Sequence, residues 1–251
     1  MLAGVRAYVA ASAVVPPSAL LPAAERRRAG MPVKIALAVA QEACLHAARE
    51  PDSLATVFTS SSGDGDTMHH IFESLASSER EVSPTRFHNS VHNAAAGYWS
   101  IATQSRQPST SLCCYDASFS AGLLDAATQA AVSGMPVALI AYDHPYPEPL
   151  HSKRRLSGTF GVALVIAPES TQHSLARIDV QLSRGAGDIG PMRNPDLEAL
   201  RSGIPAARSL PLLCILARSA EDTIAIAYSD ATHVQVSVSQ FGLRAAGMEA
   251  R

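Results

Sequence analysis

The chain has 251 residues, enough for one large hydrophobic core or two small ones, and we expect a single domain over residues 1–251. Hydrophobic residues make up 47% of the sequence and charged residues only 17%, which excludes a disordered chain. The net charge of -2 and an aromatic content of 5% argue against a nucleic-acid-binding protein, which needs basic patches and stacking side chains.

The cysteines and the N-terminal residues indicate in which cellular compartment the protein resides. No two of the four cysteines form a C-x-x-C motif, and the pair Cys113-Cys114, next to Leu112, suggests a buried strand with reduced thiols. Arg6 before an apolar run resembles a secretion signal, but Pro16-Pro17 would break that helix, so a strand–loop–helix opening is favoured. No stretch reaches the ~18 apolar residues of a membrane span. We therefore expect a cytoplasmic protein without a membrane span.

The first part of the chain alternates between strand and helix patterns. Residues 5–14 and 54–60 have the β-branched and apolar character of strands. Residues 32–49 show helical periodicity with apolar or alanine positions on most faces, so this helix should be largely buried. The Ser- and Gly-rich residues 59–66 predict a loop, and residues 67–75 a short helix.

The middle of the chain continues the alternation. Ser83-Pro84 predicts the start of one helix that runs to about residue 103, followed by a strand at 110–115 and an Ala-rich helix at 121–133. Residues 137–141 are apolar without alternation, which is typical of a strand covered by helices on both faces. The pattern predicts an α/β fold with a mixed, mostly parallel sheet between helices.

The last part is less regular. Three prolines within residues 143–149 predict an exposed loop, and residues 161–166 predict a strand. In residues 174–182 and 225–238, apolar and polar residues alternate more clearly, as they do in strands with one solvent-exposed face. Residues 183–210 predict a loop and a short helix.

The most informative motif is the turn between the strand at 110–115 and the following helix. Small residues surround this turn, as they do where a fold lifts one side chain into a pocket. Phe119 is the one large side chain among Ser118, Ser120 and Ala121, so we expect it to be displayed at the tip. A phenyl ring is not a nucleophile.

This turn resembles that of β-ketoacyl synthases, whose nucleophilic cysteine follows an Asp-x-Ala pattern between a strand and a small-residue helix. Asp116, Ser120 and Leu123 match the pattern, and Phe119 falls on the position of the cysteine. The upstream segment 83–97 and Arg26-Arg27 also fit the resemblance. It implies a degenerate turn at Asp116, Ser118, Phe119 and Ser120 with no catalytic residue.

The resemblance covers about residues 1–168 and implies the N-terminal half of a thiolase-like fold, with residues 169–251 adding strands that complete the domain. From the resemblance we expect that the second half of a β-ketoacyl synthase, with its two catalytic histidines, is not part of this chain. Partners that lack the cysteine are known as chain length factors, and a short subgroup is associated with aryl polyene biosynthesis. The resemblance thus implies a non-catalytic subunit that pairs with a full-length β-ketoacyl synthase as a heterodimer and shapes its acyl tunnel.

The resemblance also implies candidate residues for the subunit interface, the acyl tunnel and carrier-protein binding. In the family, the strand before the turn pairs with its counterpart in the other subunit, which makes residues 110–115 our candidate interface strand. The candidates for the acyl tunnel or the interface are Phe87, Asn89, His92, Asn93, Trp99, Cys113, Cys114 and Phe119. The basic run Lys153-Arg154-Arg155 either faces solvent or attracts an acidic acyl carrier protein.

Other interpretations stay open. Ser118-Phe-Ser120-Ala-Gly122 approximates the G-x-S-x-G elbow of a serine hydrolase or acyltransferase that uses Ser120. His88 and His92 are four residues apart, as zinc ligands on one helix face are, yet helix-end hydrogen bonds explain His92 better, and we expect no metal. The loop at residues 60–65 lacks the lysine of a P-loop, so we expect no nucleotide cofactor. A homodimeric acyl-binding module is a further alternative.

Overall fold

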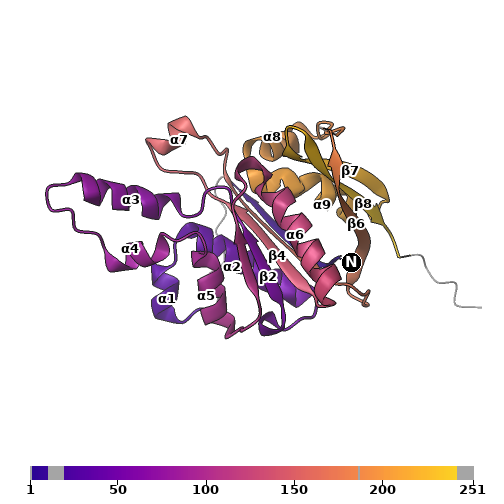
Figure 1. The fold of residues 1–251 in the computed structure, drawn as a ribbon, viewed down its shortest axis with the longest axis horizontal. Coiled ribbons are helices and arrows are strands. Elements are labelled where there is room, and N and C mark those ends of the chain that lie inside the picture. Colours follow the sequence, from indigo (N-terminus) through magenta and orange to yellow (C-terminus); the bar gives the residue numbers. More distant parts are fainter. Residues whose placement is uncertain (1, 11–19, 186, 242–251) are drawn as a thin grey trace, which may run out of the picture.

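The computed structural model describes residues 2–10, 20–185 and 187–241, with an eight-stranded sheet that runs through the molecule (Figure 1). The strands are β1 (Leu2–Ala10), β2 (Ala55–Thr59), β3 (Ser109–Leu112), β4 (Val137–Asp143), β5 (Thr159–Ile166), β6 (Ser174–Arg184), β7 (Asp222–Ser229) and β8 (Thr232–Ser239). The part of the first predicted strand beyond residue 10 lies outside the described residues.

Helices fill most of the connections between the strands. The α-helices are α1 (Ala23–Arg28), α2 (Met31–His46), α3 (Gly65–Ala76), α4 (Pro84–Asn89), α5 (Ala94–Thr103), α6 (Ser118–Ser133), α7 (Leu150–Lys153), α8 (Pro195–Gly203) and α9 (Leu210–Ala217). Three short 3₁₀ helices are η1 (Pro51–Ser53), η2 (Tyr115–Ala117) and η3 (Pro205–Ser209). No helix in this described part is long and apolar enough to cross a membrane.

The strand order is β3-β2-β4-β5-β1-β6-β8-β7. Among the described strands only β2 with β3 and β2 with β4 pair in parallel, and the other neighbours are antiparallel. The sheet is therefore mixed, but the expectation that it is mostly parallel is wrong. A parallel connection needs a crossover, usually through a helix, whereas β4 and β5 are joined by a segment whose only helix is the four-residue α7.

Both faces of the sheet are covered in the part formed by β2, β4 and β5, as the unbroken apolar run of β4 predicts. Leu139 belongs to a core that α6, η3 and α9 cover, and its neighbour Ile140 belongs to a second core on the opposite face, under α2 and α5. Val57 and Phe58 of β2 divide between the two cores in the same way. This alternation follows from the two-residue period of a strand.

Three element predictions need correction. The helix expected from residue 83 to residue 103 is two helices, α4 and α5, because the chain turns at residues 90–93. The predicted strand at 225–238 is the hairpin of β7 and β8, and the fully helical α9 before it was not predicted. Cys113 and Cys114 lie beyond the end of β3 and are exposed, not buried in a strand.

Candidate functional site: the turn before α6 and the carboxyl edge

The three parallel strands end at one edge of the sheet, the edge where ligands bind in open α/β folds. Ser60 and Ser61 follow β2, Cys113 and Cys114 follow β3, and Asp143 ends β4. The Sγ atom of Cys113 lies 3.6 Å from the carbonyl oxygen of Ser61, which joins the ends of β2 and β3. Sequence reasoning named these cysteines but gave no indication that the two serines and the aspartate would meet them.

Asp143 is a buried carboxylate that ties three segments together. Its Oδ1 atom accepts hydrogen bonds from the Ser61 amide at 2.8 Å and the Ser61 hydroxyl at 2.7 Å, and its Oδ2 atom accepts one from the Ala206 amide at 2.7 Å. Burial raises its pKa, although the hydrogen bonds from Ser61 and Ala206 act in the opposite direction. The residue is the end of β4 and not part of an exposed proline-rich loop, as the sequence had suggested.

The turn between α4 and α5 is attached to the same edge. The Nε2 atom of His92 lies 2.8 Å from the carbonyl oxygen of Leu112, the last residue of β3. His88 belongs to α4 whereas His92 follows that helix, so the two imidazoles do not share a helix face as a zinc pair would. Asn93 is exposed and its side chain makes no capping hydrogen bond to α5.

The chain bends sharply between β3 and α6. Tyr115 has φ of 52° and its side chain is 61% exposed, so it is the residue displayed at the bend. The Ser118 hydroxyl donates to the Tyr115 carbonyl at 2.7 Å and accepts from the Cys114 amide at 3.1 Å, and the Thr59 hydroxyl donates to the Ser118 carbonyl at 2.7 Å. These bonds hold the bend against the end of β2.

Phe119 is not displayed at the tip, and that expectation is wrong. Its side chain is 0% exposed and packs in the core between α6 and the sheet. Trp99 is likewise buried, in the core beneath α2 and α5. Large apolar side chains gain most by leaving water, and α6 begins one residue earlier than Phe119 with its apolar side turned to the sheet.

The Ser120 hydroxyl also makes structural hydrogen bonds. Its buried hydroxyl lies 2.9 Å from the Ala117 carbonyl and 2.7 Å from the Ala227 carbonyl. Its partners are carbonyl oxygens instead of a histidine, whereas a nucleophilic serine needs a base within hydrogen-bond reach. Two other histidines are bound elsewhere: His144 contacts Thr159 at 2.6 Å, and His233 contacts the Gly185 carbonyl at 2.9 Å.

The Cys114 thiol at this edge is not activated by its surroundings either. Partial burial raises the pKa of the Cys114 thiol, and the neighbouring Cys113 acts in the same direction. A reactive cysteine needs the opposite shift, because the thiolate is the nucleophile.

Asp116 joins the bend to two distant segments. Its carboxylate lies 2.9 Å from Arg154 and 3.2 Å from Arg208, and the Arg154 guanidinium stacks 3.5 Å from the centre of the Tyr115 ring. Arg154 is therefore a structural partner of the turn and not a free cation for a carrier protein, whereas Lys153 and Arg155 are exposed. Arg208 was not predicted from the sequence, because no motif links it to Asp116.

The two remaining candidates on α4 differ in exposure. Phe87 is 70% exposed, which is unusual for a side chain of that size. Asn89 is buried, where its amide nitrogen donates to the Arg28 carbonyl at 2.9 Å and its Oδ1 accepts from the Tyr98 hydroxyl at 3.0 Å. Asn89 thus fixes α4 in place while Phe87 points outward.

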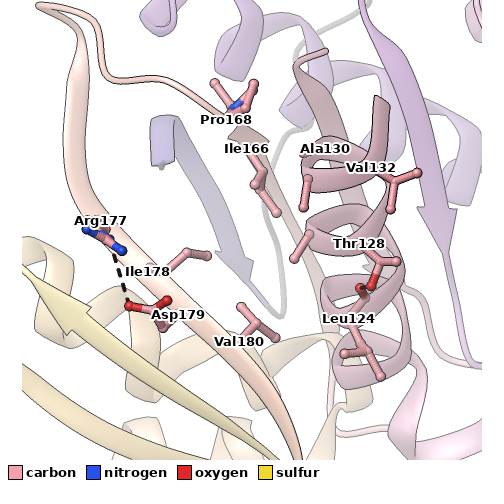
Figure 2. Close-up of a pocket in the computed structure, with 13 residues that line it drawn as sticks. Leu124, Thr128, Ala130, Val132, Ile166, Pro168, Arg177, Ile178, Asp179 and Val180 are labelled. Carbon is pink, nitrogen blue, oxygen red and sulfur yellow. Dashed lines mark hydrogen bonds and ion pairs between the residues drawn. The ribbon is translucent and has the colours of Figure 1, made fainter. Parts of the chain in front are cut away.

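A hollow of about 730 Å³ lies between α6 and β6, as Figure 2 shows. Leu124 and Ala130 of α6 face Ile178 and Val180 of β6 across it, and Arg177 and Asp179 form an ion pair on its wall at 3.8 Å. Among the described residues β1 and β6 pair at two positions, both before Arg177, so β6 is not paired with β1 along the hollow. Its lining residue Ile166 pairs with Val137, the first residue of β4, which places the hollow toward the opposite edge from the turn.

The geometry thus defines a class of protein: a mixed sheet between helix layers, with a strand that turns tightly into a central helix at its carboxyl edge. Known structures of this class include one chain of the ketosynthase ApeO in complex with its chain length factor ApeC from Xenorhabdus doucetiae, with 21% identity and a TM-score of 0.67 over 92% of this chain and 87% of that one. The ishigamide ketosynthase/chain length factor is similar at 14% identity, with a TM-score of 0.67 over 86% of this chain and 82% of that one.

A third structure is a type II polyketide synthase, an acyl-carrier protein in complex with its ketosynthase bound to a hexaketide. It shares 9% identity with a TM-score of 0.63, over 88% of this chain and 85% of that one. The fold is therefore the thiolase-like fold of ketosynthases. The family described as beta-ketoacyl synthase, N-terminal domain, matches residues 4–197, and the chain belongs to that family. No curated protein matches the chain.

Proposed function

We propose that this chain is a non-catalytic, chain-length-factor-like subunit that pairs with a full-length β-ketoacyl synthase. The pair would extend an acyl chain carried by an acyl carrier protein, in polyketide or fatty-acid-type biosynthesis of the aryl polyene kind. The observation that carries the proposal is the fully buried Phe119 at the position that the resemblance gives to the nucleophilic cysteine. The hydroxyls of Ser118 and Ser120 beside it are both bound to backbone carbonyls, so neither replaces the missing nucleophile.

The position of β3 supports pairing with another subunit. It is the outermost strand on its side of the sheet, and its residues carry no charge and no proline that would discourage another strand from adding to it. The Pro108 and Leu112 carbonyls accept from β2, so by alternation the backbone groups of Ser109 and Ser111 face outward. Among the described residues these outward groups lie next to no further strand.

The exposed side chains of the α4–α5 region support a role in shaping the partner's tunnel. Phe87 is 70% exposed and Val91 is more than half exposed. The hydrogen bond from His92 to the Leu112 carbonyl holds their segment at the end of β3. A subunit paired along β3 would therefore meet these apolar side chains close to the carboxyl edge. The four free cysteines suit a reducing compartment, and we place the subunit in the cytoplasm.

Co-expression of the tagged chain with a full-length β-ketoacyl synthase from the same cells tests the proposal. Affinity capture followed by size-exclusion chromatography should recover a stoichiometric pair. Ser111→Pro should abolish pairing, because it removes an outward N–H of β3 while the inward bonds to β2 remain. Thr223→Pro on β7, the opposite edge strand, is the matched control, since the Thr223 amide donates to the side chain of its neighbour Asp222.

Recovery of the synthase with the unchanged chain and with Thr223→Pro, but not with Ser111→Pro, supports pairing along β3. Recovery of the chain alone as a homodimer contradicts the proposal and favours an independent acyl-binding module.

A further inference from the structure

A cavity of about 210 Å³ lies where α8, η3 and α9 meet the edge strand β7, at one end of the molecule (Figure 1). Its lining is of two chemical kinds. The apolar residues are Ile189, Pro211, Ala225, Ile226 and Ala227, and the polar residues are Arg201, Ser202 and Arg208. We call it the arginine cavity.

The two arginines of the cavity differ in how well they are paired. Arg201 binds both carboxylate oxygens of Glu198, at 2.7 Å from Nε and 2.6 Å from Nη2. Arg208 lies 3.2 Å from Asp116, but its guanidinium group donates no hydrogen bond to any residue that the structure describes. A guanidinium group has five N–H donors, so those of Arg208 are available to a molecule in the cavity.

The charge around the cavity is positive. Asp116 is shared by Arg208 and Arg154, and Glu198 belongs to Arg201, so three arginines face two carboxylates. Burial lowers the pKa of the Arg208 guanidinium and Asp116 raises it, while the positive charges of Arg201 and Arg154 lower it. An arginine keeps its proton at neutral pH in spite of such effects. One positive charge is therefore uncompensated, and a single negative charge would balance it.

The size and the lining of the cavity define the class of ligand. Pockets for drug-sized ligands commonly measure about 300–1,000 Å³, so this cavity suits a smaller molecule. A carboxylate accepts two parallel hydrogen bonds from a guanidinium group and brings one negative charge. The apolar residues of β7 and α9 would then contact a short hydrocarbon or aromatic body. An inorganic phosphate has no such body and would leave these residues without a partner.

We propose that the arginine cavity binds a small organic acid as its anion, with the carboxylate on Arg208 and the apolar body against β7. The site is distinct from the surface assigned to the synthase, because β7 and β3 are the opposite edge strands of the sheet. It therefore does not depend on the proposed function.

The cavity is also connected to the turn before α6. The carbonyl of Ala227 accepts a hydrogen bond from the Ser120 hydroxyl at 2.7 Å, and Arg208 pairs with Asp116 of η2. A bound carboxylate competes with Asp116 for the same guanidinium group, and the two negative charges repel each other. Removal of the Asp116 charge should therefore strengthen binding of the anion.

Titration of the purified full chain with benzoate, followed by ligand-observed NMR, tests the site. Benzamide has nearly the same shape without the charge and should bind about tenfold more weakly than benzoate, as should benzoate to Arg208→Met. Arg154→Met is the matched control. It removes the other arginine partner of Asp116 but does not line the cavity, so it should retain most of the affinity for benzoate.

Asp116→Asn should tighten benzoate binding by about threefold, the effect of one repelling charge in a water-like dielectric. A misfolded variant cannot give this gain in affinity. The site is overturned if benzamide binds as well as benzoate, or if the unchanged chain does not bind benzoate. Equal losses in Arg208→Met and Arg154→Met, or weaker binding by Asp116→Asn, also contradict it. None of these outcomes bears on pairing with a synthase, which is measured separately.

Discussion

Gly161 of β5 shows how one residue sets the distance between the sheet and α2. A Cβ atom at this position would lie 2.5 Å from Cγ2 of Ile35 and 3.2 Å from Cγ1 of Val39, both on α2. Because Ile and Val are branched at Cβ, these methyl groups cannot swing aside without moving the helix backbone. The glycine therefore permits an approach that no other residue would.

Gly161→Ala should accordingly destabilise the protein by about 1–3 kcal/mol, the usual effect of overpacking a filled core. Urea unfolding followed by circular dichroism measures this difference. Gly97→Ala is the control, since a Cβ there meets nothing within 4 Å and the residue lies in α5, where alanine should add about 0.5–1 kcal/mol. Unchanged stability of Gly161→Ala would show that α2 can shift freely.

Asp143 makes the stability depend on pH in an unusual direction. Burial raises its pKa above the ordinary 3.8, so in the folded state the carboxyl group holds its proton to higher pH than in the unfolded state. The folded state then binds more protons over this range, and the contribution of Asp143 to stability falls as pH rises from 3.8 through the raised pKa. Most paired carboxylates give the opposite slope.

Asp143→Asn removes this titration, so the unfolding free energy of the variant should not show the decrease with rising pH that Asp143 causes. The difference in unfolding free energy between the unchanged protein and the variant should be larger at about pH 4 than at about pH 7, measured by urea unfolding. The variant should be the less stable of the two at the lower pH, because an amide nitrogen would face the Ala206 N–H that now donates to Oδ2. A difference that grows with pH would contradict the assignment.

At the scale of elements, the sequence predicts what local periodicity determines. The apolar run of β4, the buried surface of α2 and the strand–turn–helix at residues 109–133 are all present, because their patterns follow from the faces they bury. The break between α4 and α5 has no such pattern. It depends on the hydrogen bond of His92 to Leu112, twenty residues away, which no sequence window contains.

The turn before α6 shows the same limit at the site. The sequence identified the bend and its small residues, but not which side chain turns outward. Phe119 is drawn into the core, while Tyr115 is held outward by the Arg154 guanidinium on its ring. Arg154 and Arg208 reach Asp116 from segments 38 and 92 residues further along the chain, a contact that only the folded sheet creates.

At the scale of the whole molecule, the two edge strands of the sheet differ in charge and in their surroundings. The hairpin of β7 and β8 forms one edge, whose strand β7 carries the charged Asp222. The other edge is the short, uncharged β3, beside the exposed apolar side chains of the α4–α5 region. Under the proposed function, the second edge meets the synthase, so exposed residues there act on the product whereas buried ones act on stability.

Phe87 and Phe119 separate these two roles. In the pair with the synthase, Phe87→Ala should change the ratio of neighbouring product lengths by about tenfold, because removing apolar wall from a binding pocket alters discrimination by that order. Since Phe87 is 70% exposed, the thermal stability of the Phe87→Ala variant should equal that of the unchanged protein. Phe119→Leu should lower stability by about 1–2 kcal/mol, because leucine is smaller and leaves part of the core unfilled, and it should leave the product ratio unaltered. Mass spectrometry of the products, with thermal unfolding of each variant, measures both effects. A product ratio that responds to Phe119→Leu but not to Phe87→Ala would place the tunnel wall inside this subunit and contradict the assignment.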